Sequence, residues 1–185
     1  MGHRALVAYE RPDGRYDVHY SHWGADLDLG RRITPETPFG RRSGDGPVVE
    51  PDPRASGLAL VALIADHLDF LHHEALYLVG TDSEVTEYRV LQFLVATADG
   101  VLSGDETVGR GALVEVSPFD PGSGYVRGWF DGVRDAVGEM IDTGSMDERD
   151  AFGYLEDRLR RFAGLDREVM IDPMRDRDDF CPSSE

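Results

Sequence analysis

The sequence predicts an α+β protein with a mostly antiparallel sheet, an N-terminal β-hairpin, one buried helix and a C-terminal helical hairpin. Three observations predict this class: alternating residues around a Pro-Asp-Gly turn, apolar runs of strand length in the middle, and apolar residues at helical spacing in the last third. With 185 residues, 41% of them hydrophobic, the chain is long enough to bury a core. We therefore expect residues 1–171 to form a single domain.

The hairpin is the clearest local pattern. Residues 5–9 are an apolar run, and residues 16–23 alternate with a period of two. Between them, Pro12 and Gly14 suit a type I turn followed by a left-handed residue, which pairs Arg11 with Arg15. This register places four residues on the core face: Leu6, Ala8, Val18 and Tyr20. The opposite face gathers His3, Ala5, Val7, Tyr9, Asp17, His19, Ser21 and Trp23, a mixture typical of a face that is solvated or covered by something polar.

The middle of the chain alternates between irregular and apolar stretches. Residues 24–53 are rich in Gly, Pro, Arg and Asp without a sustained period, and loops of this length are usually functional or mobile. Residues 55–71 predict the buried helix. Strands are expected at residues 76–79, 87–96 and, more weakly, 112–116.

The last third predicts two packed helices. The first has apolar residues at offsets of three and four: Val126, Trp129, Phe130, Val133, Val137, Met140 and Ile141. The second starts with a Ser145–Glu148 capping box and ends at Gly164, with Phe152, Leu155, Leu159 and Phe162 along one side. The acidic tail, residues 172–185, is expected to be mobile unless a partner holds it.

Charge indicates the environment of the protein. The chain has 19 Arg and no Lys against 36 acidic residues, for a formal net charge of −17. A GC-rich genome explains the absence of Lys and Asn, but it does not explain the excess of acid. Self-repulsion of this size is screened in molar salt, where the Debye length falls to roughly 3 Å. We therefore expect a halophilic protein that works in a salt-rich cytoplasm.

Other features are consistent with a cytoplasmic location. The most apolar run, residues 58–64, is too short to cross a bilayer, and the N-terminus lacks the pattern of a signal peptide. The one cysteine, Cys181, lies in the polar tail and has no partner for an internal disulfide.

The hairpin also carries a resemblance. Residues 2–14, GHRALVAYERPDG, and residues 19–24, HYSHWG, resemble a small family of uncharacterised haloarchaeal proteins. The remainder of the chain resembles that family more weakly. The resemblance implies a group of host organisms, and it implies no catalytic residues because the family has no assigned activity.

Two arginine pairs in the long loop are candidate binding residues. They are Arg31 with Arg32 and Arg41 with Arg42, each pair preceded by Gly. Guanidinium groups bind carboxylates, phosphates and nucleic acids well. His19 and Trp23 on the hairpin would extend this recognition surface for an anionic or protein partner, with Trp23 and Phe39 offering stacking faces. Internal pairing with the more numerous Asp and Glu is the competing interpretation.

One histidine-containing segment suggests a metal site as the alternative. Asp66, Asp69 and His73 would share one side of the predicted helix and could bind a divalent metal, with His3 or His19 completing the site. The competing interpretation is the exposed end of an amphipathic helix, since no established metal motif is present.

Two functional hypotheses follow from these patterns. The favoured one is a non-catalytic binding or interaction protein that recognises an anionic or protein partner. The alternative is a metal-dependent hydrolase acting on a phosphoester. The sequence contains neither a nucleophile elbow nor a glycine-rich phosphate loop.

Overall fold

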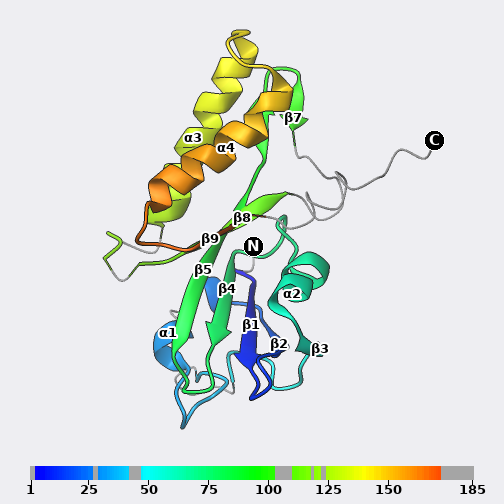
Figure 1. Ribbon diagram of the computed structural model, residues 1–185, viewed down its shortest axis with the longest axis vertical. Helices are drawn as coiled ribbons and strands as arrows, with labels where there is room; N and C mark the ends of the chain where they lie inside the picture. Colours follow the sequence, from blue (N-terminus) through cyan, green and yellow to red (C-terminus); the bar gives the residue numbers. More distant parts are fainter. Residues whose placement is uncertain are drawn as a thin grey trace, which may run out of the picture.

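A seven-stranded sheet forms the centre of the protein (Figure 1). The computed structural model describes residues 3–26, 29–41, 47–102, 110–117, 119–121 and 124–171. In sheet order the strands are β3 (Ala55–Leu58), β2 (Tyr16–Ser21), β1 (Ala5–Glu10), β4 (Ala75–Val79), β5 (Val85–Gln92), β8 (Gly111–Glu115) and β9 (Val169–Ile171). Among these described strands, only the β1–β4 pairing is parallel. The predicted α+β class with a mostly antiparallel sheet is confirmed.

The remaining elements are short helices, two long helices and a small ribbon. The helices are η1 (Gly24–Asp26), α1 (Leu29–Arg32), α2 (Leu60–His67), α3 (Tyr125–Asp142) and α4 (Glu148–Ala163). The ribbon pairs β6 (Val95–Thr97) with β7 (Gly100–Leu102). None of the helices in the described ranges is long and apolar enough to span a membrane.

The N-terminal hairpin has the predicted register. Leu6 lies opposite Tyr20, and Ala8 lies opposite Val18. The Arg11 backbone N–H donates to the carbonyl oxygen of Arg15 at 2.7 Å, and Gly14 takes a φ of +74°. A glycine adopts this left-handed conformation without the strain that a Cβ would bring, so the turn is determined locally.

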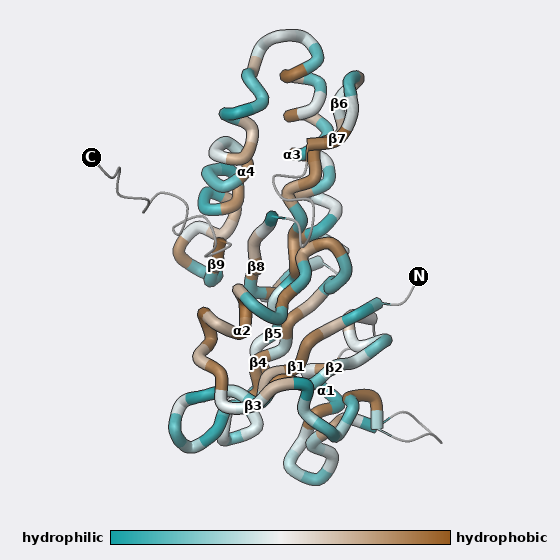
Figure 2. Tube along the Cα trace, turned by 90° about the vertical axis from the view of Figure 1, so that its right-hand side faces the viewer, coloured by the Kyte–Doolittle hydropathy of each residue, from teal (hydrophilic) through white to brown (hydrophobic). Residues whose placement is uncertain are grey.

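The two faces of the sheet are covered by different segments. On one face, α2 contributes Leu63 and Ile64 to a cluster with the predicted core residues of the hairpin. On the other face, residues 25–26, 29–41 and 47–49 cover the β1–β4 half, and α3 and α4 cover the β5–β8–β9 half. In Figure 2 the central strands are largely hydrophobic, whereas α3 and α4 alternate between hydrophobic and hydrophilic residues, as expected for helices with one buried face.

The long loop covers the hairpin face that was expected to be solvated or covered by polar groups. That expectation holds for only part of the face: His19 and Ser21 hydrogen-bond to backbone carbonyl oxygens of the loop, whereas Ala5 and Val7 are fully buried beneath its apolar side chains. The covering residues are Ala25, Leu29, Ile33 and Val49, all buried. Ala25, Leu29 and Ile33 recur at every fourth residue, but Val49 lies far outside this short series, so the sequence does not indicate that all four share one inward side.

The helix predicted to be buried is shorter than expected and only partly buried, with Leu63 and Ile64 inside and Val61 62% exposed. Residues 55–58 form edge strand β3, which pairs with β2, and α2 ends at His67 rather than at Leu71. A short apolar run does not distinguish a strand from a helix by periodicity alone. Gly57, with a φ of +70°, and extended Leu68 mark where the helical conformation is absent.

The C-terminal helical hairpin is present. Trp129 of α3 and Phe162 of α4 stack with ring centroids 4.0 Å apart, which joins the two helices. Gly164 ends α4 with a φ of +61°, as predicted. The predicted capping box is wrong, because α4 begins at Glu148 after an Asp147 N-cap without a side-chain capping bond. Residues 172–185 lie outside the described part of the chain.

Candidate functional site

A small pocket lies where α3 approaches the sheet. Its volume is about 240 Å³, and its walls come from β5, from the connection between α2 and β4, and from α3. Apolar lining residues are Phe70, Leu71, Val90, Leu91 and Phe130. Polar lining residues are His73, Glu74, Gln92, Arg127, Asp131 and Arg134. The pocket thus combines an apolar wall with charged groups of both signs.

Arg134 is only partly satisfied by its protein partners. Its Nη1 donates to the carbonyl oxygen of Gln92 at 3.3 Å, and its Nη2 donates to Oδ1 of Asp131 at 2.5 Å. Its Nε is buried and finds no hydrogen-bond partner in the described structure. A buried N–H without an acceptor destabilises a protein by about 1–3 kcal/mol, so this group requires an explanation.

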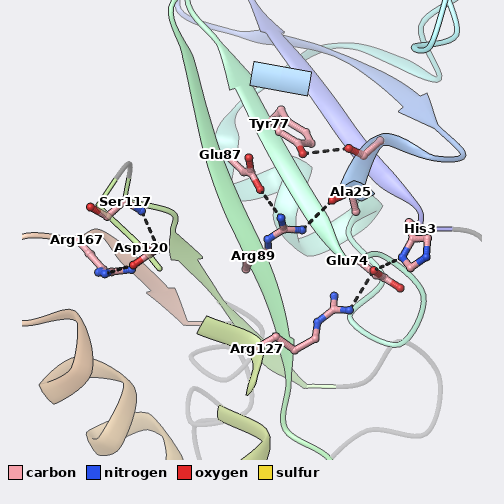
Figure 3. A network of polar contacts seen from close by, with 11 residues as sticks. His3, Ala25, Glu74, Tyr77, Glu87, Arg89, Ser117, Asp120, Arg127 and Arg167 are labelled. Carbon is pink, nitrogen blue, oxygen red and sulfur yellow. Dashed lines mark hydrogen bonds and ion pairs between the residues drawn. The ribbon is translucent and has the colours of Figure 1, made fainter. Parts of the chain in front are cut away.

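Glu74 links the N-terminus to α3 beside the same pocket (Figure 3). Its Oε2 lies 3.0 Å from Nδ1 of His3 and accepts from Nη1 of Arg127 at 3.1 Å. Burial opposes ionisation of the Glu74 carboxyl, but the hydrogen bond from His3 and the charge of Arg127 outweigh it and lower the pKa. Glu74 is therefore an anion at neutral pH.

His73 supplies a neutral imidazole to the pocket wall. Its Nδ1 accepts a hydrogen bond from the backbone N–H of Asp69 at 3.0 Å. Burial lowers its pKa to about 4. The positive charges of Arg54 and Arg4 also lower the pKa, whereas the negative charge of Asp69 raises it. In the neutral form the proton resides on Nε2, which makes that nitrogen a donor.

The formal charges of the side chains that line the pocket sum to zero. Glu74 and Asp131 contribute two negative charges, and Arg127 and Arg134 contribute two positive charges. The sum is zero in a chain whose formal net charge is −17. The pocket therefore differs electrostatically from the average surface of the protein.

The predicted metal ligands do not form a common group. Asp66 is exposed near the end of α2, whereas Asp69 lies beyond that end. Oδ1 of Asp69 accepts from the backbone N–H groups of Leu71 and His72. Among the described residues, no three His, Cys, Asp or Glu side chains are grouped so that they could hold a metal ion. The helix assumed for this site ends too early to align its residues.

His19 lies inside the protein rather than on the predicted recognition surface. Its side chain is covered by the long loop, and the residue is 6% exposed. Nδ1 donates to the carbonyl oxygen of Glu50 at 2.8 Å, and the ring packs against Tyr9 and Phe39. These contacts give His19 a role in fastening the loop to the sheet.

The structure brings the two arginine pairs together. Nη1 of Arg32 in α1 donates to the carbonyl oxygen of Arg41 at 3.0 Å, and Arg31 and Arg41 are exposed. Arg42 lies outside the described residues.

Trp23 is 45% exposed, and its ring lies 6.4 Å from that of His3, before β1. Its chain neighbour Gly24 lies against Leu29, the first residue of α1, because a Cβ on Gly24 would be 2.9 Å from Cδ1 of Leu29.

The pocket residues were missed because distant parts of the sequence supply them. Glu74 precedes β4, Gln92 ends β5, and Arg127 and Arg134 lie on α3. One local signal was present: the two arginines are seven residues apart, so they share one side of a helix whose neighbouring residues are apolar. Their carboxylate partners cannot be identified from that spacing.

The fold and the pocket define an α+β protein with a mixed sheet and a small, charge-balanced pocket between the sheet and α3. The chain belongs to a family of unknown function, DUF6735, whose model matches residues 1–48 and 43–171. No curated protein and no solved structure matches the chain.

Proposed function

We propose that this protein is a binding protein whose pocket holds a small organic anion with an apolar part. The observation that supports this function best is the place of Arg134 in the pocket wall, together with its buried Nε, which has no hydrogen-bond partner in the described part of the structure. A carboxylate or phosphate oxygen in the pocket would accept charge-assisted hydrogen bonds from the Arg134 guanidinium, and a side-chain rotation would bring the now inaccessible Nε to the ligand. The proposal keeps the anionic ligand expected from the sequence and moves its site to α3.

The apolar wall supports an amphipathic ligand. Phe70, Val90 and Phe130 line the pocket together with the charged groups, so a purely inorganic anion would leave this surface unused. The volume of about 240 Å³ lies below the roughly 300–1,000 Å³ typical of pockets for drug-sized molecules. A ligand with one acidic group and one compact apolar group fits these properties.

Isothermal titration calorimetry with 3-phenylpropanoate in molar KCl tests the proposal. Arg134→Gln should weaken binding by roughly 10- to 100-fold, because a hydrogen bond to a charged group contributes about 1.5–3 kcal/mol. Arg149→Gln, which removes an exposed positive charge from α4, is the matched control and should leave affinity unchanged. Equal affinities for both variants, or no binding by the parent protein, would contradict the proposed site.

The acidic composition supports a salt-rich cytoplasm as the working environment. A net charge of −17 on 185 residues is unfavourable for a compact chain at low ionic strength and is screened at high ionic strength. At high salt, an apolar contribution to ligand binding also persists while purely electrostatic attraction weakens. The mixed character of the pocket suits such a solvent.

The two arginine pairs, which lie close together, support a second candidate function, binding of nucleic acid. Contact between Arg32 and Arg41 brings both sequences to one place on the protein, which we name the arginine surface after Arg31, Arg32 and Arg41. Fluorescence anisotropy with a labelled single-stranded oligonucleotide tests it. Loss of binding in Arg31→Gln/Arg41→Gln, but not in Arg149→Gln/Arg161→Gln, would support this function, and binding that survives both changes would contradict it.

A further inference from the structure

One oxygen of the Glu74 carboxylate retains hydrogen-bonding capacity. Both of its protein partners, His3 and Arg127, contact the same oxygen, Oε2. Oε1 accepts no hydrogen bond within the described part of the structure, although an ionised carboxylate oxygen can accept about two. The Glu74 side chain is 25% exposed and lines the pocket. An acceptor therefore remains for a donor on the ligand.

The pocket thus pairs an acceptor with a donor. Arg134 has a buried N–H without a partner, and Glu74 has a carboxylate oxygen without one. Residues 74 and 134 come from different elements, the connection before β4 and helix α3, and both line the cavity. A ligand that carried only an anionic group would satisfy the arginine and leave the glutamate unused.

Charge balance favours a ligand with both signs. The four ionised pocket residues sum to zero, so a ligand with a single negative charge would give the occupied pocket a net negative charge. That ligand would also be repelled by the net charge of −17 on the chain wherever salt is too dilute to screen it. A zwitterion avoids both penalties, since its own charges cancel.

We propose that the ligand is a free α-amino acid with an apolar side chain, bound with its carboxylate near Arg134 and its ammonium group near Glu74. This inference rests on the proposed function and specifies its ligand class. The apolar side chain would contact Phe70, Val90 and Phe130, which line the remainder of the cavity. The compact volume of about 240 Å³ suits an amino acid better than a peptide or a nucleotide.

Three related compounds separate the inference from the function on which it rests. L-Phenylalanine, 3-phenylpropanoate and 2-phenylethylamine share the aromatic group but carry both charged groups, only the carboxylate, or only the ammonium group. Calorimetry with the unmodified protein in molar KCl should show that phenylalanine binds at least about tenfold more tightly than either analogue, because each analogue lacks one charge-assisted hydrogen bond.

Each of the other outcomes would contradict the amino-acid inference, and some would also contradict the proposed function. Equal binding of phenylalanine and 3-phenylpropanoate would overturn the amino-acid inference while leaving the anion-binding function intact. Tightest binding of 2-phenylethylamine would overturn the inference and the role of Arg134 together. Absence of binding by all three compounds would contradict both proposals.

A variant and its control test whether the ammonium group of the ligand lies near Glu74. Glu74→Gln keeps the shape of the side chain but removes its charge, so phenylalanine affinity should fall about tenfold while 3-phenylpropanoate affinity should not fall. Glu139→Gln, an exposed position on α3, is the matched control and should leave both affinities unchanged. Circular dichroism checks that each variant is folded, and the three-compound comparison stands without any variant. A Glu74→Gln protein that binds phenylalanine normally would overturn the assignment.

Discussion

The protonation state of His73 depends on its surroundings in the fold rather than on its neighbours in sequence. Burial and the nearby charges of Arg4 and Arg54 disfavour the imidazolium form, and the pKa falls to about 4. The Asp69 backbone N–H adds a hydrogen bond that only an unprotonated Nδ1 can accept. The ring that resembled a metal ligand in the sequence is instead a neutral donor in the wall of the pocket.

The lowered pKa of His73 predicts a pH dependence of stability. The unfolded chain takes up a proton near pH 6.5, whereas the folded protein resists it down to about pH 4. The free energy of unfolding should therefore decrease as pH falls through this window, and near pH 5 this residue should account for about 1–2 kcal/mol of the loss. Urea unfolding at several pH values measures it.

The His73→Gln variant isolates this contribution. Because Gln does not titrate, the variant should lose less stability than the parent protein between about pH 6.5 and pH 4, whatever its stability at neutral pH. Parallel curves for the two proteins across this window would show that His73 is not responsible.

Residue-scale predictions from sequence succeeded only where geometry was local. The pairing of Leu6 with Tyr20 follows from the turn residues alone. The burial of His19 does not, because it depends on where Glu50 and Phe39 lie after the loop has folded over the sheet. Arg134 and Glu74 are 60 positions apart in a chain without a local motif for either, so their common pocket requires the tertiary structure.

At the scale of elements, close packing fixes α3 against the ribbon formed by β6 and β7. Gly138 is buried in α3, and a Cβ there would collide with the backbone carbonyl oxygen of Ala96 in β6. Gly132, in the same helix, has open space where its Cβ would lie. The two glycines therefore have different physical roles despite similar sequence surroundings.

Alanine substitutions at these glycines should have opposite effects. Gly138→Ala should destabilise the protein by roughly 1–3 kcal/mol, the usual range for overpacking a buried contact. Gly132→Ala should stabilise it by roughly 0.5–1 kcal/mol, because alanine favours a helix interior over glycine. Urea midpoints compare the two. A Gly138→Ala protein as stable as Gly132→Ala would show that α3 does not approach β6 this closely.

The elements themselves were predicted unevenly, for physical reasons. α3 and the hairpin repeat their apolar residues regularly enough to identify their type. Residues 55–58 do not, since an edge strand and the first turn of a buried helix can share the same short apolar run. The long loop was harder still, because Ala25, Leu29 and Ile33 form only a short series at every fourth residue, and Val49 belongs to no such series.

At the scale of the whole molecule, sheet order and net charge are the dominant features. The parallel contact between β1 and β4 places residues 70 positions apart side by side, and no local pattern reveals it. Net charge, by contrast, depends only on composition and could be read directly. The halophilic setting therefore remains a proposal from composition that solution measurements can test.

The net charge of −17 predicts salt-dependent stability. The urea midpoint should rise as KCl increases from about 0.1 M to about 1 M, while the Debye length falls from about 10 Å to about 3 Å. Sucrose, which favours compact states without screening charge, is the control. An unchanged midpoint in KCl, or an equal rise in sucrose, would argue against relief of charge repulsion.

The location of the ligand site can be measured directly by two-dimensional NMR of the protein in molar KCl during titration with L-phenylalanine. The binding site proposed here predicts saturable shifts of the backbone amide signals of Gln92, Arg127 and Arg134, with little change at Arg31 and Arg41. Shifts confined to α1, or no saturable shift at any concentration, would contradict a ligand pocket between β5 and α3.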